Sequence, residues 1–227
     1  MKTSDRILCG LVAVLLTATI GVDFILKQGY AGVRLNDPYR AYLKMDVLPF
    51  RHLRITGGNG YAIEIRQAKE YGMKVMRSRE RFFSYVRRGD TLTIQFAVAS
   101  ISANPDPGQL PLGLIISAPR LASLSAEGTS NLIREWSSDS LQIGLGGNAT
   151  ANISRVNLTG LAVVGSQKAR INFDSANTVK SLRLDLNHAA SVYLNQIRFH
   201  RLVPTLAGDS HLILGSHAAS MFFDGGK

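Results

Sequence analysis

The chain has 227 residues, of which 45% are hydrophobic and 19% are charged, so its composition is that of a folded protein and excludes a disordered one. Aromatic residues make up only 7%, which means that a core must be built mainly from Leu, Ile and Val. The single Cys excludes an internal disulfide framework and a Cys-based zinc cluster. The formal net charge of +10 would suit a nucleic-acid-binding protein only if the charge were concentrated in one region. The distribution of the charged residues along the chain therefore has to be considered.

The N-terminal residues 1–27 are predicted to be a membrane anchor or signal segment. Residues 7–26 form an apolar run in which only Asp23 is charged, and a run of this length can cross a hydrocarbon core about 30 Å thick. Lys2 and Arg6 precede the run and favour a cytoplasmic N-terminus. Because Thr19 and Gly21 form only a weak signal-cleavage site, an uncleaved anchor is favoured over a cleaved signal.

Either interpretation exports the rest of the chain, so the predicted location is the cell envelope, with the main domain outside the cytoplasm, in the periplasm or on the surface. Cys9 lies in the apolar run. The exported part therefore contains no cysteine, which is compatible with an oxidising compartment.

The remaining residues are predicted to form a short connector followed by one continuous β domain. Residues 92–98 alternate between apolar and polar side chains, as a half-buried strand does. The predicted divisions are a connector at 28–49 and a head domain at 50–227, with initial strands at 50–110 and repeated coils at 111–220.

The second half of the chain contains a repeat of about 20 residues. Equivalent leucines recur at spacings of 17, 20, 21 and 20: Leu124, Leu141, Leu161, Leu182 and Leu202. Each opens a short alternating strand, and small polar residues follow it. A unit of this size cannot bury a core alone, so the units must stack. The pattern predicts an all-β solenoid with two short strands in each coil.

A leucine-rich repeat is the structural alternative. Residues 179–187 fit the pattern L-x-x-L-x-L-x-x-N, but the other units lack Asn at that place. Their second segments, such as residues 169–173, alternate like strands and not like helices. The β-solenoid is therefore favoured.

The order of these segments resembles the head GIN domain family of auto-transporter adhesins, which is common in Bacteroidetes envelopes. The resemblance covers about residues 50–217 and rests on the alternating strands at 50–55, 62–65 and 90–94, the segment 119–128 and the repeated units after it. It implies a right-handed β-helix-like solenoid of about 20-residue coils. The anchor-like N-terminus and the basic first half depart from the family pattern, and the resemblance supplies no site residues.

The positive charge is concentrated in the first half of the chain. Its densest group, here called the basic cluster, comprises Lys74, Arg77, Arg79, Arg81, Arg87 and Arg88, with Glu80 as the only acid among residues 74–88. Export argues against nucleic acid as the partner. The alternatives are a merely solvated hairpin face and a candidate binding patch for anionic lipid headgroups or acidic polysaccharide.

Catalytic signatures are weak. None of His52, His188, His200, His211 and His217 belongs to an H-E-x-x-H motif or a close metal-binding pair. The acidic residues of the second half are scattered, whereas polysaccharide-cleaving β-helix enzymes need paired carboxylates. We therefore expect no enzyme, no cofactor and no metal site, with a polysaccharide-acting enzyme as the remote alternative.

The sequence thus predicts an exported, membrane-anchored, non-enzymatic envelope protein that acts in adhesion or in binding a glycan or another surface ligand. A scaffolding or regulatory partner of another envelope protein is the alternative. Exposed candidates on the repeated units are Lys168, Arg170, Arg183 and Tyr193.

Overall fold

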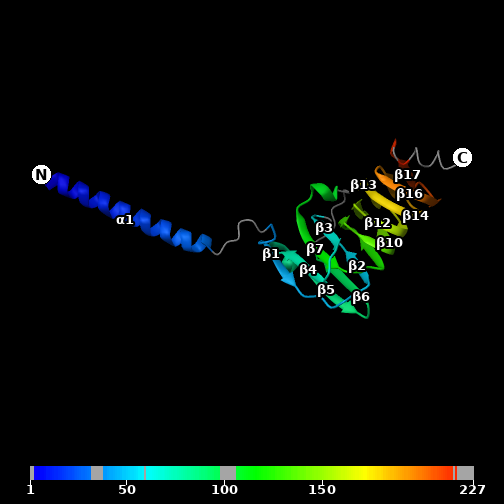
Figure 1. Cartoon of the computed structure of the whole chain (residues 1–227), viewed down its shortest axis with the longest axis horizontal. Helices are drawn as coiled ribbons and strands as arrows, with labels where there is room; N and C mark the ends of the chain where they lie inside the picture. The colour runs from blue at the N-terminus through cyan, green and yellow to red at the C-terminus, as the bar shows by residue number, and fades with distance from the viewer. Residues whose placement is uncertain (1–2, 32–37, 59, 98–105, 217, 219–227) are drawn as a thin grey trace. The chain divides into compact units, whose positions relative to one another are not determined.

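The computed structural model describes residues 3–31, 38–58, 60–97, 106–216 and 218, and Figure 1 shows the chain with its elements labelled. The chain divides into two compact units, Met1–Ala41 and Tyr42–Lys227. Parts of the predicted divisions, including residues 98–105 and 219–227 as well as His217, lie outside the described residues.

The first unit contains the helix α1 (Thr3–Ala31), as the apolar run predicts. Its segment Gly10–Gln28 has a mean hydropathy of 1.9 and is fully exposed, so its length and composition suit a membrane span. The Thr17 hydroxyl donates to the Ala13 carbonyl at 3.0 Å, and the Thr19 hydroxyl donates to the Leu15 carbonyl at the same distance. These bonds satisfy both hydroxyls within the helix, as an apolar environment would require.

The second unit consists of two large β-sheets. The nine-stranded sheet, here sheet A, has the strand order β1 (Tyr42–Met45), β4 (Gly72–Met76), β7 (Leu112–Ala118), β3 (Ala62–Gln67), β9 (Ser130–Arg134), β11 (Thr150–Ser154), β13 (Arg170–Ser175), β15 (Ser191–Leu194) and β17 (His211–Leu214). The eight-stranded sheet, here sheet B, has the order β16 (Ile197–Leu206), β14 (Asn177–Leu186), β12 (Asn157–Gly165), β10 (Ser137–Gly146), β8 (Ser123–Glu127), β2 (His52–Thr56), β6 (Thr91–Phe96) and β5 (Phe83–Arg88).

From β8 onward the strands alternate between the two sheets, and each pairs in parallel with the next strand of its own sheet. The register pairs four of the five predicted leucines: Leu141 faces Leu161, Leu161 faces Leu182, and Leu182 faces Leu202. Leu124 does not follow the prediction, because it is in register with Ile143. Alternation then sends these side chains to one face of sheet B. Leu141, Leu161 and Leu182 are all buried.

One hydrophobic core collects the inward side chains of both sheets. It runs from Phe50 to Ala218 and contains residues of sheet B such as Leu53 and of sheet A such as Ile63. No described residue of α1 belongs to it. The β unit therefore holds its own core, and a fragment that begins at residue 38 is expected to fold without the helix.

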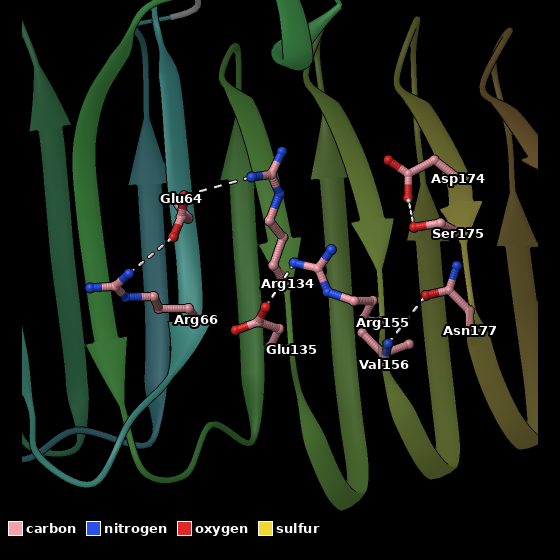
Figure 2. Close-up of polar contacts among 9 residues, drawn as sticks. All are labelled: Glu64, Arg66, Arg134, Glu135, Arg155, Val156, Asp174, Ser175 and Asn177. Atoms are coloured by element: carbon pink, nitrogen blue, oxygen red, sulfur yellow. Dashed lines mark hydrogen bonds and ion pairs between the residues drawn. The ribbon is translucent and has the colours of Figure 1, made fainter. Parts of the chain in front are cut away.

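The corners between the sheets require left-handed backbone, which sequence reasoning assigns to glycine. Glycine does occupy the turns after β8 and β10, at Gly128 and Gly147, with positive φ. On the other side of the unit, Glu135 and Arg155 take φ of 56° and 54°. Figure 2 shows that the two side chains meet: Arg155 Nη2 lies 2.7 Å from Glu135 Oε1, so an exposed ion pair joins two consecutive corners.

The prediction of a right-handed β-helix-like solenoid is wrong. The unit is mostly β, but it comprises two large mixed sheets that include antiparallel pairs, β1 with β4, β4 with β7, and β5 with β6. Strands also pair out of chain order, because β2 lies between β6 and β8, and β3 lies between β7 and β9. Alternation in the first half reveals that a strand exists but carries no information about its direction or its partner.

Candidate functional site

The basic cluster is distributed over three consecutive segments. Lys74 lies in β4, and Arg77, Arg79 and Arg81 lie in a 3₁₀ helix, η1 (Arg77–Phe82). The remaining members, Arg87 and Arg88, lie in β5. Because β4 belongs to sheet A and β5 is the edge strand of sheet B, η1 carries the chain from one sheet to the other.

The members of the basic cluster do not share one sheet face. Lys74 alternates with buried Met73 and Val75, so it points outward from sheet A, where it is paired with Lys44. Arg88 pairs with Thr91, whose neighbour Leu92 is buried, so Arg88 points outward from sheet B. The cluster therefore extends around the β1–β5 end of the unit.

Aromatic rings and main-chain groups fix several of these side chains. The guanidinium carbon of Arg79 lies 5.4 Å from the ring centroid of Tyr61, and that of Arg81 lies 4.7 Å from the ring centroid of Phe82. Arg87 Nε donates to the Pro49 carbonyl at 2.9 Å. Such contacts order the stems and leave the charges at the surface.

Three cations elsewhere on the β unit, Arg66, Arg134 and Arg155, are matched by carboxylates. Figure 2 shows Glu64 between two of them, with Arg66 at 3.5 Å and Arg134 at 4.0 Å. In the basic cluster, by contrast, Arg87 pairs with Asp90 at 3.8 Å, and the described residues include no carboxylate ion pair of Arg77, Arg79, Arg81 or Arg88. Positive charge in η1 and β5 is therefore less compensated than it is around Glu64 and Glu135.

Two further residues belong to the same surface, and the sequence did not reveal them. Arg54 and His52 are exposed on β2, whose neighbour is β6. Through β6, Arg54 lies in register with Val86, and His52 lies in register with Arg88. The alternation of residues 52–56 was visible, but no sequence signal links β2 to a hairpin more than 30 residues later.

Apolar side chains are exposed beside these cations. Tyr85 is 39% exposed and Val86 is 46% exposed, both on edge strand β5. The Tyr85 and Phe83 rings are stacked with their centroids 6.0 Å apart. Basic residues mixed with exposed aromatic and aliphatic side chains are typical of surfaces that meet a lipid interface or a polymer.

Tyr61 is the buried residue on which Arg79 of the basic cluster packs. Its ring is buried and meets the Phe96 ring edge-on, with centroids 5.2 Å apart. Burial raises the pKa of the Tyr61 hydroxyl well above its ordinary value, and the Arg79 charge opposes this shift only in part. The Tyr61 hydroxyl therefore keeps its proton to a higher pH than an exposed tyrosine does.

The histidines that the structure describes do not assemble into a metal site. Among the described residues, no group of three His, Cys, Asp or Glu side chains is close enough to hold a metal ion. His52 Nδ1 lies 2.8 Å from Ser123 Oγ, and His188 Nδ1 lies 3.0 Å from Asn187 Oδ1. Both histidines thus make local polar contacts with neighbouring uncharged side chains.

Comparison with known proteins shows similarity at the level of the fold. No family model and no curated protein matches the chain. Its β unit shares the fold of a solved "putative adhesin" from Bacteroides fragilis, with a TM-score of 0.53 and 12% identity over 77% of this chain and 95% of the other. A "putative adhesin" from Parabacteroides distasonis matches with a TM-score of 0.37 and 11% identity over 76% of this chain and 93% of the other. A "putative lipid binding protein" from the same organism matches with a TM-score of 0.38 and 9% identity over 76% of this chain and 95% of the other.

Proposed function

We propose that this protein is a membrane-tethered, non-enzymatic binding protein of the cell envelope, and that its basic cluster attaches it to an anionic surface. The ligand groups would be phosphates of lipid headgroups or carboxylates of acidic polysaccharide. Helix α1 would hold the protein at the membrane, and the β unit would supply a rigid platform outside the cytoplasm. The fold shared with the "putative adhesin" from Bacteroides fragilis is in keeping with this role.

The observation that carries the proposal is the density of cations in η1 and β5, among which Arg87 alone pairs with a carboxylate of the described residues. Arg66, Arg134 and Arg155 are matched by Glu64 and Glu135. Exposed cations of η1 and β5 have few acidic neighbours in the sequence, namely Glu80 and Asp90. A charge that is not internally compensated attracts counter-charge from outside, and each basic residue near an anionic membrane contributes about 1 kcal/mol.

Binding can be measured with the fragment of residues 38–227, which contains the whole described core. Vesicles of phosphatidylglycerol and phosphatidylcholine are compared with phosphatidylcholine alone, and polygalacturonate is compared with neutral dextran. We expect binding to an anionic member of these pairs that falls steeply between about 0.05 M and about 0.5 M salt, because screening shortens the reach of exposed charges.

The two sources of negative charge give separate results. Binding to the anionic vesicles alone assigns lipid headgroups, and binding to polygalacturonate alone assigns acidic polysaccharide. Binding to both assigns the charge density itself. Equal binding to the neutral member of each pair, or no binding to either anion, contradicts the proposal.

A protein partner is the second candidate, and the opposite end of the β unit favours it. Strands β16 and β17 are the last strands of their sheets. Val203, Leu206 and Ile213 on them are 37%, 48% and 39% exposed. Edge strands with exposed apolar side chains can accept a partner. A photo-crosslinker at Val203 should then give a discrete adduct in intact cells, whereas one at exposed Val164 of β12 should not.

A further inference from the structure

A groove of about 310 Å³ lies on the outer face of sheet A, away from the basic cluster. Its lining is mostly polar and includes one aromatic ring. The residues that would contact a ligand are Asp106, Asn152, Arg170, Asn172, Tyr193 and Asn195. The volume is at the lower end of the range for small-molecule sites. From these residues we propose that the groove binds a neutral hexose unit of a polysaccharide.

The floor of the groove is produced by the register of three parallel strands. Asn152 of β11 faces Asn172 of β13, which in turn faces Tyr193 of β15. All three side chains are half-buried and lie between inward-facing neighbours. Since neighbouring strands lie about 4.8 Å apart, the row extends for about 10 Å, which matches a short stretch of sugar rings.

One wall is formed by a short segment that crosses the sheet. Asp106 caps the 3₁₀ turn η2 (Pro107–Gln109), because its Oδ1 accepts from the Gly108 amide at 2.9 Å. The same oxygen accepts from Asn152 Nδ2 at 2.8 Å. Pro107 is buried in the contact. These bonds fix the wall against β11, so the groove is preformed.

The floor amides are held in defined orientations. Asn195 Nδ2 donates to Asn172 Oδ1 at 2.8 Å, which assigns the Asn172 amide group. Among the described residues, no hydrogen bond from Asn172 Nδ2 is present. Its two hydrogens, together with the second carboxylate oxygen of Asp106, form a donor and acceptor set suited to vicinal hydroxyl groups.

The aromatic ring supplies the apolar part of the site. The Arg170 guanidinium carbon lies 6.0 Å from the ring centroid of Tyr193, which restrains the ring in the groove. Tyrosine combines an apolar face with a polar tip, as a sugar ring combines C–H groups with hydroxyls. Asp106 and Arg170 contribute one charge of each sign, so the lining has no net charge and favours a neutral sugar.

Saturation-transfer NMR on the full chain in a sugar-free polyoxyethylene detergent tests this site. The probes are cellohexaose, maltohexaose and mannohexaose, with hexagalacturonate as the acidic comparison. Transfer to at least one neutral hexaose is expected. Tyr193→Phe should retain it, whereas Tyr193→Ala and Asn172→Ala should weaken association at least about tenfold. Arg183→Ala, outside the groove on β14, should leave it unchanged.

Several results would overturn the assignment. One is the absence of saturation transfer to every neutral hexaose, and another is unaltered sugar binding by the Tyr193→Ala variant. A third is tighter binding of hexagalacturonate than of the neutral sugars. The thermal transition of buried Trp136 shows that each variant is folded. Binding of Tyr193→Ala to anionic vesicles or polygalacturonate should equal that of the parent, which separates this site from the basic cluster.

Discussion

The guanidinium carbon of Arg79 lies 5.4 Å from the ring centroid of Tyr61, whose hydroxyl is buried and has no hydrogen-bond partner among the described residues. This pair joins the basic cluster to the core. Arg79 is half-buried over the ring, while Tyr61 is only 2% exposed. The surface charge is therefore positioned by packing beneath it, and the buried hydroxyl gives this region a distinct response to pH.

Alkaline pH should destabilise the β unit through Tyr61. Its pKa in the folded state is raised by burial above the unfolded value of about 10. Above that pH the unfolded chain loses a proton that the folded chain retains, so the free energy of unfolding falls by about 1.4 kcal/mol per pH unit. Below it this group makes no difference. Urea unfolding followed by Trp136 fluorescence at several pH values measures the slope.

Tyr61→Phe is the matched control for this prediction. It keeps the ring against Phe96 and removes the titrating hydroxyl, so that component of the slope should vanish. Stability at neutral pH should stay equal or rise slightly, because an unpaired buried hydroxyl is lost. An identical alkaline slope in both proteins would show that Tyr61 is not the group responsible.

Gly113→Ala should destabilise the β unit by about 1–3 kcal/mol, through overpacking. Gly113 is the extra residue of a bulge, because Ala62 pairs with Leu112 and Ile63 pairs with Leu114. A methyl group added there would collide with the Tyr61 ring. Thermal or urea unfolding of the fragment measures the loss.

Gly144→Ala provides the comparison for the bulge. The nearest atom to a methyl group at Gly144 is the Leu124 carbonyl oxygen at 3.9 Å, an ordinary contact. The free energy of unfolding of the Gly144→Ala variant should equal that of the parent or exceed it by about 0.5 kcal/mol, because alanine restricts the unfolded chain. Equal losses in the two variants would rule out the collision with Tyr61 as the cause.

Asn177→Ala should cost about 2–3 kcal/mol, because the buried Val156 amide and the Ile153 carbonyl lose their side-chain partner, whereas the Gln196 carbonyl keeps the main-chain amide of residue 177. Asn177 Nδ2 donates to the Ile153 carbonyl at 3.1 Å and to the Gln196 carbonyl at 3.3 Å. Its Oδ1 accepts from the Val156 amide at 3.3 Å, as Figure 2 shows. Exposed Asn157 is the control, and its replacement by Ala should change the unfolding free energy by less than about 0.5 kcal/mol.

The sequence predicted the N-terminal helix, the predominance of strands and the positions of the paired leucines, since these depend on local patterns of period and composition. It could not predict the mixed sheets. Whether β2 pairs with β6 and β8 depends on contacts distant in the chain. Local alternation at residues 52–56 is the same whichever strand lies beside it.

The candidate sites show the same limit. The cations of the basic cluster are close in sequence and were found there, but Arg54 reaches their surface through sheet pairing alone. Arg170 and Tyr193 were recognisable as exposed candidates. Asp106, which forms the groove wall beside them, comes from a loop 46 residues before its partner Asn152 and had no signal in the sequence.

The central claim is that the basic cluster, and not the total charge, binds an anionic surface. The most direct measurement is the dissociation constant for anionic vesicles or polygalacturonate of two double variants with the same loss of charge. Arg77→Glu with Arg88→Glu alters the basic cluster, and Arg183→Glu with Arg201→Glu alters exposed cations of β14 and β16.

We expect the first pair to weaken binding at least about tenfold, given about 1 kcal/mol for each basic residue at an anionic surface. The second pair should have a much smaller effect. Equal weakening by the two pairs, or unchanged binding by the first, would contradict the account.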